Sequence, residues 1–105
     1  MKIHCVYNSR FASLVGAAGI TIYPFIFFAD NKEKAISEHV LSHEWVHVLQ
    51  VRKLGWFRFY ATYVWIYFRN RFQGMSADES YYAVPYEQEA YAGEDKQVVP
   101  MDEIA

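Results

Sequence analysis

The sequence predicts a small α+β fold in which a short β-sheet packs on a central helix. Residues 2–7 and 20–28 are rich in β-branched and aromatic side chains, which is typical of strands. Residues 31–54, 56–72 and 86–92 carry the start and stop signals that mark helices. With 105 residues, of which 53% are hydrophobic and 21% are charged, the chain is long enough for one core and too apolar to be disordered.

The two predicted strands differ in their expected place in the sheet. Residues 2–7 alternate between the two faces of a strand, and residues 8–19 allow either a short helix or a loop. Pro24 lies inside the second predicted strand, residues 20–28, and has no N–H to donate to a neighbouring strand. We therefore expect this strand at an edge of the sheet, where its free backbone groups can pair with an extended peptide.

A long central helix is expected over residues 31–54. Asp30 and Glu33 form the Asp-x-x-Glu pattern of a capping box, and Gly55 supplies the residue type that commonly ends a helix. Bulky apolar side chains occur on more than one side of this segment, so we expect the helix to be packed on several faces.

Two further helices are expected after the central one. Residues 56–72 are rich in Tyr, Phe and Trp and include three arginines, whereas residues 73–80 are polar and are expected to form a loop. Pro85 suits the first position of a short helix over residues 86–92, because a proline there removes no helical hydrogen bond. The aromatic helix is expected to link the central helix to this last one.

Charge is distributed unevenly along the chain. Residues 1–72 contain nine Lys and Arg against four Asp and Glu, and residues 73–105 contain one against eight, so balances of +5 and −7 give the net charge of −2. We expect residues 1–92 to form a single domain and residues 93–105 to form an acidic, unstructured tail. The small net charge predicts no nucleic-acid partner.

A membrane-spanning segment is not expected. Residues 11–29 carry no charge, but their glycines and Pro24 weaken a helix, and their second half favours a strand. With no cleaved signal peptide expected and a single cysteine, Cys5, the sequence favours a cytoplasmic protein without internal disulfides. The aromatic segment 56–72 allows peripheral contact with a membrane surface, although packing across the central helix is the favoured interpretation.

The motif that indicates chemistry is His43-Glu44-Trp45-Val46-His47, an HExxH sequence inside the central helix. Residues four apart lie on the same side of a helix, so the two imidazoles are spaced to hold one Zn²⁺ ion. Glu44 lies about 100° around the helix from His43, where it can take a proton from water at the metal. The alternative is a central helix with two solvent-facing or core histidines, but burying two His and a Glu without partners in an apolar helix is energetically costly.

A catalytic zinc site uses three protein ligands and one open position, so a third ligand is needed. No histidine follows His47 in the sequence, which leaves a carboxylate from the C-terminal third. Six acidic side chains are candidates: Asp78, Glu79, Glu87, Glu89, Glu94 and Asp95.

The order of these motifs resembles that of the gluzincins, a family of zinc metallopeptidases. The chain is most similar in length to their small single-domain members, the minigluzincins. The resemblance rests on HExxH and on the stretch Pro-Tyr-Glu-Gln-Glu-Ala-Tyr at residues 85–91. It implies a small zincin-like fold, in which a short β-sheet with an edge strand packs on a central HExxH helix, followed by a linking aromatic helix and a glutamate helix.

The resemblance also implies which residue completes the zinc site. Glu87 matches the zinc-binding glutamate of the family, and Tyr91 stands where the family usually has an Asp that supports a metal-bound imidazole. Glu89 stays as the alternative ligand, and since it lies about 200° from Glu87 on a helix, only one of the two can face the metal.

The function that the resemblance implies is zinc-dependent hydrolysis of peptide bonds in a peptide or protein substrate, with Glu44 as general base. The group that stabilises the oxyanion is not identified, and the nearest candidates in the sequence are Tyr81, Tyr82 and Tyr86. The alternative function is a non-catalytic protein that is stabilised by zinc and binds a partner or a membrane through its aromatic surface.

Overall fold

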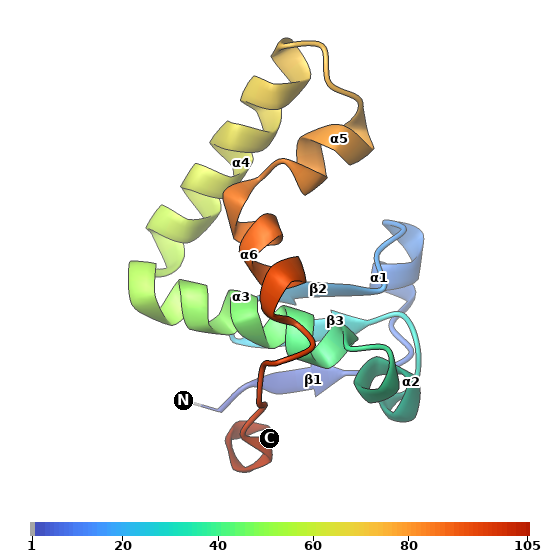
Figure 1. The fold of residues 1–105 in the computed structure, drawn as a ribbon. Coiled ribbons are helices and arrows are strands. Elements are labelled where there is room, and N and C mark those ends of the chain that lie inside the picture. The colour runs from blue at the N-terminus through green and yellow to red at the C-terminus, as the bar shows by residue number, and fades with distance from the viewer. Residues whose placement is uncertain (1) are drawn as a thin grey trace.

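The computed structural model describes residues 2–105 and has the α+β architecture that the sequence predicts (Figure 1). In chain order, its elements are β1 (His4–Val6), α1 (Arg10–Leu14), β2 (Gly19–Ile22), β3 (Phe25–Phe28), α2 (Lys32–Ser37), α3 (Val40–Leu54), α4 (Trp56–Phe72), α5 (Ala77–Tyr82), α6 (Pro85–Gly93) and a 3₁₀ turn (Met101–Glu103). The sheet and α3 form the body of the molecule, and α4 and α5 project away from the sheet.

The three strands form one sheet in the order β1-β3-β2, with β1 parallel and β2 antiparallel to β3. The single strand expected over residues 20–28 is wrong, because the chain turns back at Tyr23 and Pro24 and forms a hairpin in which Thr21 pairs with Ile26. Proline has no N–H for the ladder, so strand pairing stops there. The part before the turn, β2, is an edge strand and contacts α3.

The hydrophobic core lies between the sheet and the helices α2 and α3. Removing the apolar side chains of this core from water supplies the main driving force for folding. Because β2 and α6 also contact α3, the central helix is buried on several faces, as its apolar pattern predicts. The core cluster consists of Ile3, Ile26, Phe28, Ala35, Leu41, Trp45 and Val48.

The central helix is shorter than expected. Instead of one helix over residues 31–54, the chain forms α2 and then α3, with His39 between them in the left-handed backbone region at φ 60°. The predicted cap is also shifted by one residue, because the Asn31 side chain accepts a hydrogen bond from the Lys34 N–H, whereas Asp30 pairs with the Lys34 ammonium at 3.5 Å. Asn is as effective an N-cap as Asp, so both positions satisfy the same local rule.

The two later helices agree with the sequence, but the loop between them does not. Helix α4 occupies the predicted residues, and α6 starts with Pro85 at its first position. The loop expected over residues 73–80 contains the start of α5, which begins after Ser76 with a full capping box, since Ser76 Oγ accepts from the Glu79 N–H and Glu79 Oε1 accepts from the Ser76 N–H, both at 3.1 Å. This Ser-x-x-Glu pattern was a readable signal for a helix start.

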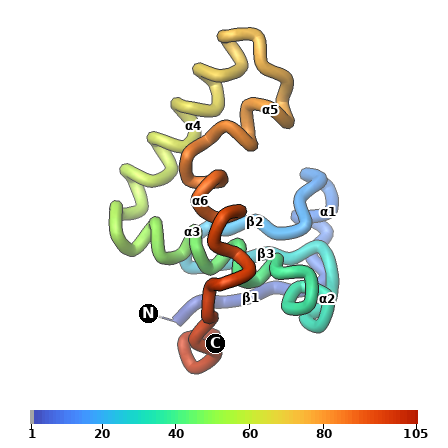
Figure 2. Tube along the Cα trace, viewed as in Figure 1, coloured from blue at the N-terminus to red at the C-terminus, as the bar shows by residue number. Residues whose placement is uncertain are grey.

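The acidic C-terminal segment is packed, so the expectation of an unstructured tail is wrong. It runs back along the body to the side of β1 (Figure 2), where Ile104 forms a parallel bridge with Ile3. The Ile3 N–H donates to the Glu103 carbonyl at 2.8 Å, and Arg52 pairs with the Glu103 carboxylate at 2.8 Å. The segment is held by an apolar contact and a backbone ladder together with this ion pair. None of the helices within residues 2–105 combines the length and the apolar character needed to cross a membrane.

Candidate metal centre

The HExxH motif lies in the first half of α3 and is turned toward α6. His43, Glu44 and His47 are all buried, and one ligand atom of each lies within 4.8 Å of the others. Trp45 and Val46, between them in the sequence, are buried in other directions around the helix. Within the described residues 2–105, the His43-Glu44-His47 group could hold a metal ion, as the motif predicts.

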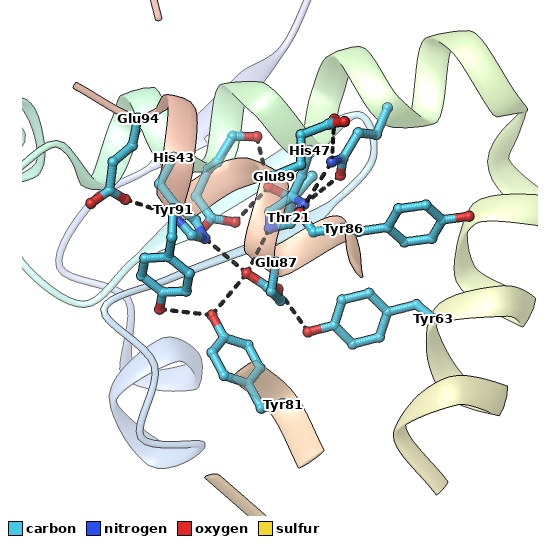
Figure 3. A network of polar contacts seen from close by, with 12 residues as sticks. Thr21, His43, His47, Tyr63, Tyr81, Tyr86, Glu87, Glu89, Tyr91 and Glu94 are labelled. Carbon is cyan, nitrogen blue, oxygen red and sulfur yellow. Dashed lines mark hydrogen bonds and ion pairs between the residues drawn. The ribbon is translucent and has the colours of Figure 1, made fainter. Parts of the chain in front are cut away.

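Glu87 reaches the same two imidazoles from α6. Its Oε1 lies 2.9 Å from His43 Nε2 and 3.0 Å from His47 Nε2 (Figure 3). Val84 and Ala90 on either side of it are fully buried, which fixes the rotation of this short helix. The structure therefore brings three donor atoms from two helices to one point.

The Nδ1 atom of His47 is held by a chain of hydrogen bonds that determines its protonation. Gln50 donates from its amide nitrogen to the Tyr86 carbonyl at 3.1 Å and to Glu89 Oε1 at 2.8 Å. Both of these oxygens accept only, so the amide oxygen of Gln50 must face His47 Nδ1, 2.8 Å away. Nδ1 must then carry a proton, and in the neutral ring Nε2 presents its lone pair toward Glu87.

Glu94 plays the corresponding part for His43. Its Oε2 lies 2.8 Å from His43 Nδ1, one helical turn beyond the position at which the gluzincin resemblance implies an Asp. Tyr91, which occupies that position, packs its ring edge-on against His43 at 4.3 Å between centroids, and its hydroxyl lies 3.2 Å from Tyr81 Oη (Figure 3). The ring nitrogen is thus supported by Glu94, a residue that the sequence suggested only as a candidate ligand.

Of the six candidate carboxylates, only Glu87 is within hydrogen-bond distance of both Nε2 atoms among the described residues. Glu89 points to Gln50 instead, and Glu79 serves the cap of α5. Asp78 lines the neighbouring cavity without such a contact, and Asp95 makes none to the imidazoles within residues 2–105.

Glu44 is held by the edge strand β2. The Thr21 hydroxyl donates to Glu44 Oε1 at 2.7 Å, while Oε2 lies 4.0 Å from His43 Nε2. Gly19 allows this close approach, because a Cβ there would lie 3.0 Å from Glu44 Cγ. Burial raises the pKa of the Glu44 carboxyl, although the charges of His47 and His43 and the bond from Thr21 oppose the shift.

Two tyrosines orient the Glu87 carboxylate. Tyr63 donates to Oε2 at 2.7 Å, and Tyr81 donates to Oε1 at 3.0 Å. Tyr81 was one of the three tyrosines expected near the site; Tyr82 also borders the cavity, and Tyr86 contributes only its carbonyl to the network. Tyr63 on α4 was missed, although it is four residues beyond the buried Phe59 and so lies on the same face of that helix.

In the absence of a metal, the surroundings raise the pKa of both imidazoles, His43 and His47. Burial lowers the pKa of His47, but its hydrogen bond with Glu87 and the charges of Glu44 and Glu87 outweigh burial and raise the pKa to about 9. For Glu87 the directions are reversed. Burial alone would raise its pKa, but its hydrogen bonds with His43 and His47 have the larger effect and hold the pKa well below the usual range. Three carboxylates around two imidazoles make a site that favours a bound cation.

An open cavity of about 1020 Å³ lies beside the motif. Its walls are β2, the residues at the start of α3 and the facing sides of α4 and α6. β2 is an edge strand that borders the cavity, and its Thr21 carbonyl accepts a hydrogen bond from the Tyr60 hydroxyl at 2.9 Å. The tyrosines that line it are Tyr60, Tyr63, Tyr67, Tyr81, Tyr82 and Tyr91.

Comparison of the chain with protein-family models, with curated proteins and with solved structures finds no match. The candidate site is therefore defined by its own geometry.

Proposed function

We propose that this protein is a zinc-dependent peptidase of the gluzincin type, with a small zincin-like fold. One observation carries the proposal: the Nε2 atoms of His43 and His47 and Oε1 of Glu87 converge within hydrogen-bond distance, and the Glu44 carboxylate lies next to them. Two imidazoles and a glutamate from a later helix are the ligand set of many catalytic zinc sites.

The donor atoms suit zinc in type and in spacing. At bond lengths of about 2.0–2.2 Å and tetrahedral angles, zinc ligand atoms lie roughly 3.4 Å apart. The observed separations of 2.9 and 3.0 Å between Glu87 Oε1 and the two Nε2 atoms need only a small outward movement to reach this value. Glu94 and Gln50 already occupy the two Nδ1 atoms, which directs both Nε2 lone pairs to the same point.

When bound there, zinc lowers the pKa of water to about 7 and polarises a carbonyl group. Glu44 is the general base: Thr21 holds its Oε1, and Oε2 is left to accept a proton from the attacking water and to pass it to the leaving amine nitrogen. Burial raises the pKa of the Glu44 carboxyl, which makes the carboxylate a stronger proton acceptor.

The edge strand β2 supports a peptide as the substrate. An extended chain can pair with its outer edge along the cavity wall once the Tyr60 hydroxyl releases the Thr21 carbonyl, and the Thr21 side chain links this strand to the base. Backbone pairing of this kind binds a peptide in an extended conformation and aligns it next to the ligand atoms.

Glu44→Gln tests the proposal, with Glu33→Gln as the matched control, since Glu33 is an exposed glutamate on α2. We expect all three proteins to hold one zinc per chain by metal analysis. Only Glu44→Gln should lose cleavage of a broad peptide library followed by mass spectrometry, by about 10²–10⁴-fold. Purified wild type without zinc affinity, or Glu44→Gln with unchanged cleavage, would refute the proposal.

A non-catalytic zinc protein is the second candidate function. The observation in its favour is the exposed aromatic surface of α4, which the chemistry of the site does not use. One zinc per chain with no cleavage by wild type, together with a lower melting temperature after zinc removal, would favour this function over the peptidase.

A further inference from the structure

Helix α4 has one face that packs against the rest of the fold and one face that is exposed to solvent. Among its residues, only Phe59 and Asn70 are buried, and Tyr63 on the same side reaches Glu87. The helix projects from the body, and no other element runs along its outer side in Figure 1. The expectation that the aromatic segment packs across the central helix therefore holds for one face only.

The outer face is an exposed apolar stripe. Its side chains fall within about 100° of arc on the helix. Phe57 is 76% exposed, Trp65 is 67% exposed and Phe72 is 91% exposed. At about 150–250 Å² for each aromatic side chain, the stripe leaves roughly 500 Å² of aromatic surface in water, which is at the size where patches are commonly functional. We define the outer stripe as Phe57, Val64, Trp65, Phe68 and Phe72.

Arginines border the outer stripe on both sides. At about 100° per residue, Arg71 lies just beyond one edge, and Arg58 and Arg69 lie just beyond the other. All three are exposed, and none forms an ion pair within residues 2–105. The sequence contains no Asp or Glu between Glu44 and Asp78, so no acidic side chain of this segment offsets the arginines.

We propose that the outer stripe docks on an anionic lipid surface, with α4 lying in the plane of the membrane interface. Aromatic side chains suit the boundary between headgroups and acyl chains, and bordering arginines can extend to the lipid phosphates. The complementarity is between the uncompensated charges of Arg58, Arg69 and Arg71 and an anionic headgroup layer. Because the cavity lies on the opposite face of α4, docking leaves the cavity open to solvent.

The same charges disfavour a second copy of the chain as the occupant. In a two-fold pair of antiparallel α4 helices centred on the stripe, equal edges face each other, so Arg58 of one copy lies close to Arg69 of the other. In a parallel pair, each edge faces the other edge of the partner helix, so Arg69 of one copy lies close to Arg71 of the other. Both arrangements place like charges together, which opposes association.

The test is co-sedimentation of the full chain with vesicles, at increasing lipid, with zinc added and with EDTA. Phosphatidylcholine–phosphatidylserine vesicles are compared with pure phosphatidylcholine. We expect binding to the mixed vesicles, which weakens as salt is raised. Trp65→Ser with Phe68→Ser should weaken binding by more than about tenfold, and replacing all three arginines by Gln should weaken it by about fivefold for each arginine.

The matched control is Leu14→Ser with Val98→Ser, which removes apolar side chains that are 86% and 80% exposed outside α4 and should leave binding unchanged. No binding by wild type, or equal binding to both vesicle types, overturns the proposal. So does a dimer in analytical ultracentrifugation that Trp65→Ser with Phe68→Ser dissociates. Glu44→Gln should bind vesicles as wild type does, so the vesicle experiment tests membrane docking separately from peptidase activity.

Discussion

Gln50→Leu tests whether the hydrogen-bond chain behind His47 prepares the site for a metal. The buried Gln50 amide lies 2.8 Å from His47 Nδ1 and is fixed by bonds of 3.1 Å to the Tyr86 carbonyl and 2.8 Å to Glu89. Leucine preserves the volume but offers no acceptor, so Nε2 is no longer forced to present its lone pair. Loss of such a partner typically weakens metal binding about 10–100-fold, or roughly 1.4–2.7 kcal/mol.

The assay is competition for zinc against a chromophoric chelator at constant pH. Gln88→Leu is the control, since Gln88 is exposed on α6 and the change is chemically identical. We expect the Kd for zinc to rise by the stated factor for Gln50→Leu alone. Equal zinc affinity of Gln50→Leu and wild type, with both proteins folded by circular dichroism, would refute the role assigned to the Nδ1 contact.

Two further predictions concern stability. The pKa of His47 without metal is raised from 6.5 to about 9, so its stabilising effect is complete below pH 6.5 and disappears as the pH rises through 9. Urea unfolding in EDTA should show a loss of up to about 3 kcal/mol over this range; a flat profile would contradict it. Gly19→Ala puts a Cβ 2.8 Å from Val40 Cγ1 and should cost about 1–3 kcal/mol. Gly93→Ala, with nothing within 4 Å, should cost less, and equal losses would count against the packing argument.

Local signals predicted those elements whose ends are marked by single residues. Helix α4 begins after Gly55 and α6 begins at Pro85, because glycine readily adopts a φ of 90° whereas proline fixes its own φ and has no N–H to donate. The break before α3 has no such marker, since the left-handed residue is His39 and no glycine or proline lies near it. Its position follows from packing α2 and α3 on one sheet, which a linear pattern does not describe.

The candidate site also has one part that local sequence signals predict and one part that depends on tertiary packing. Residues four apart on any helix lie on one side, so the sequence by itself determined that His43 and His47 lie together with Glu44 beside them. Which carboxylate meets them depends on how α6 lies against α3. The residue types and spacing left six candidates, among which the family resemblance favoured Glu87.

Tertiary packing decided that Glu87 faces both Nε2 atoms, and that Glu94 and Gln50 support the two rings. It also decided which side of α4 is exposed. Apolar side chains surround that helix, so its periodicity does not distinguish an inner from an outer face. Only contact with the rest of the fold buries Phe59 and leaves Trp65 in water.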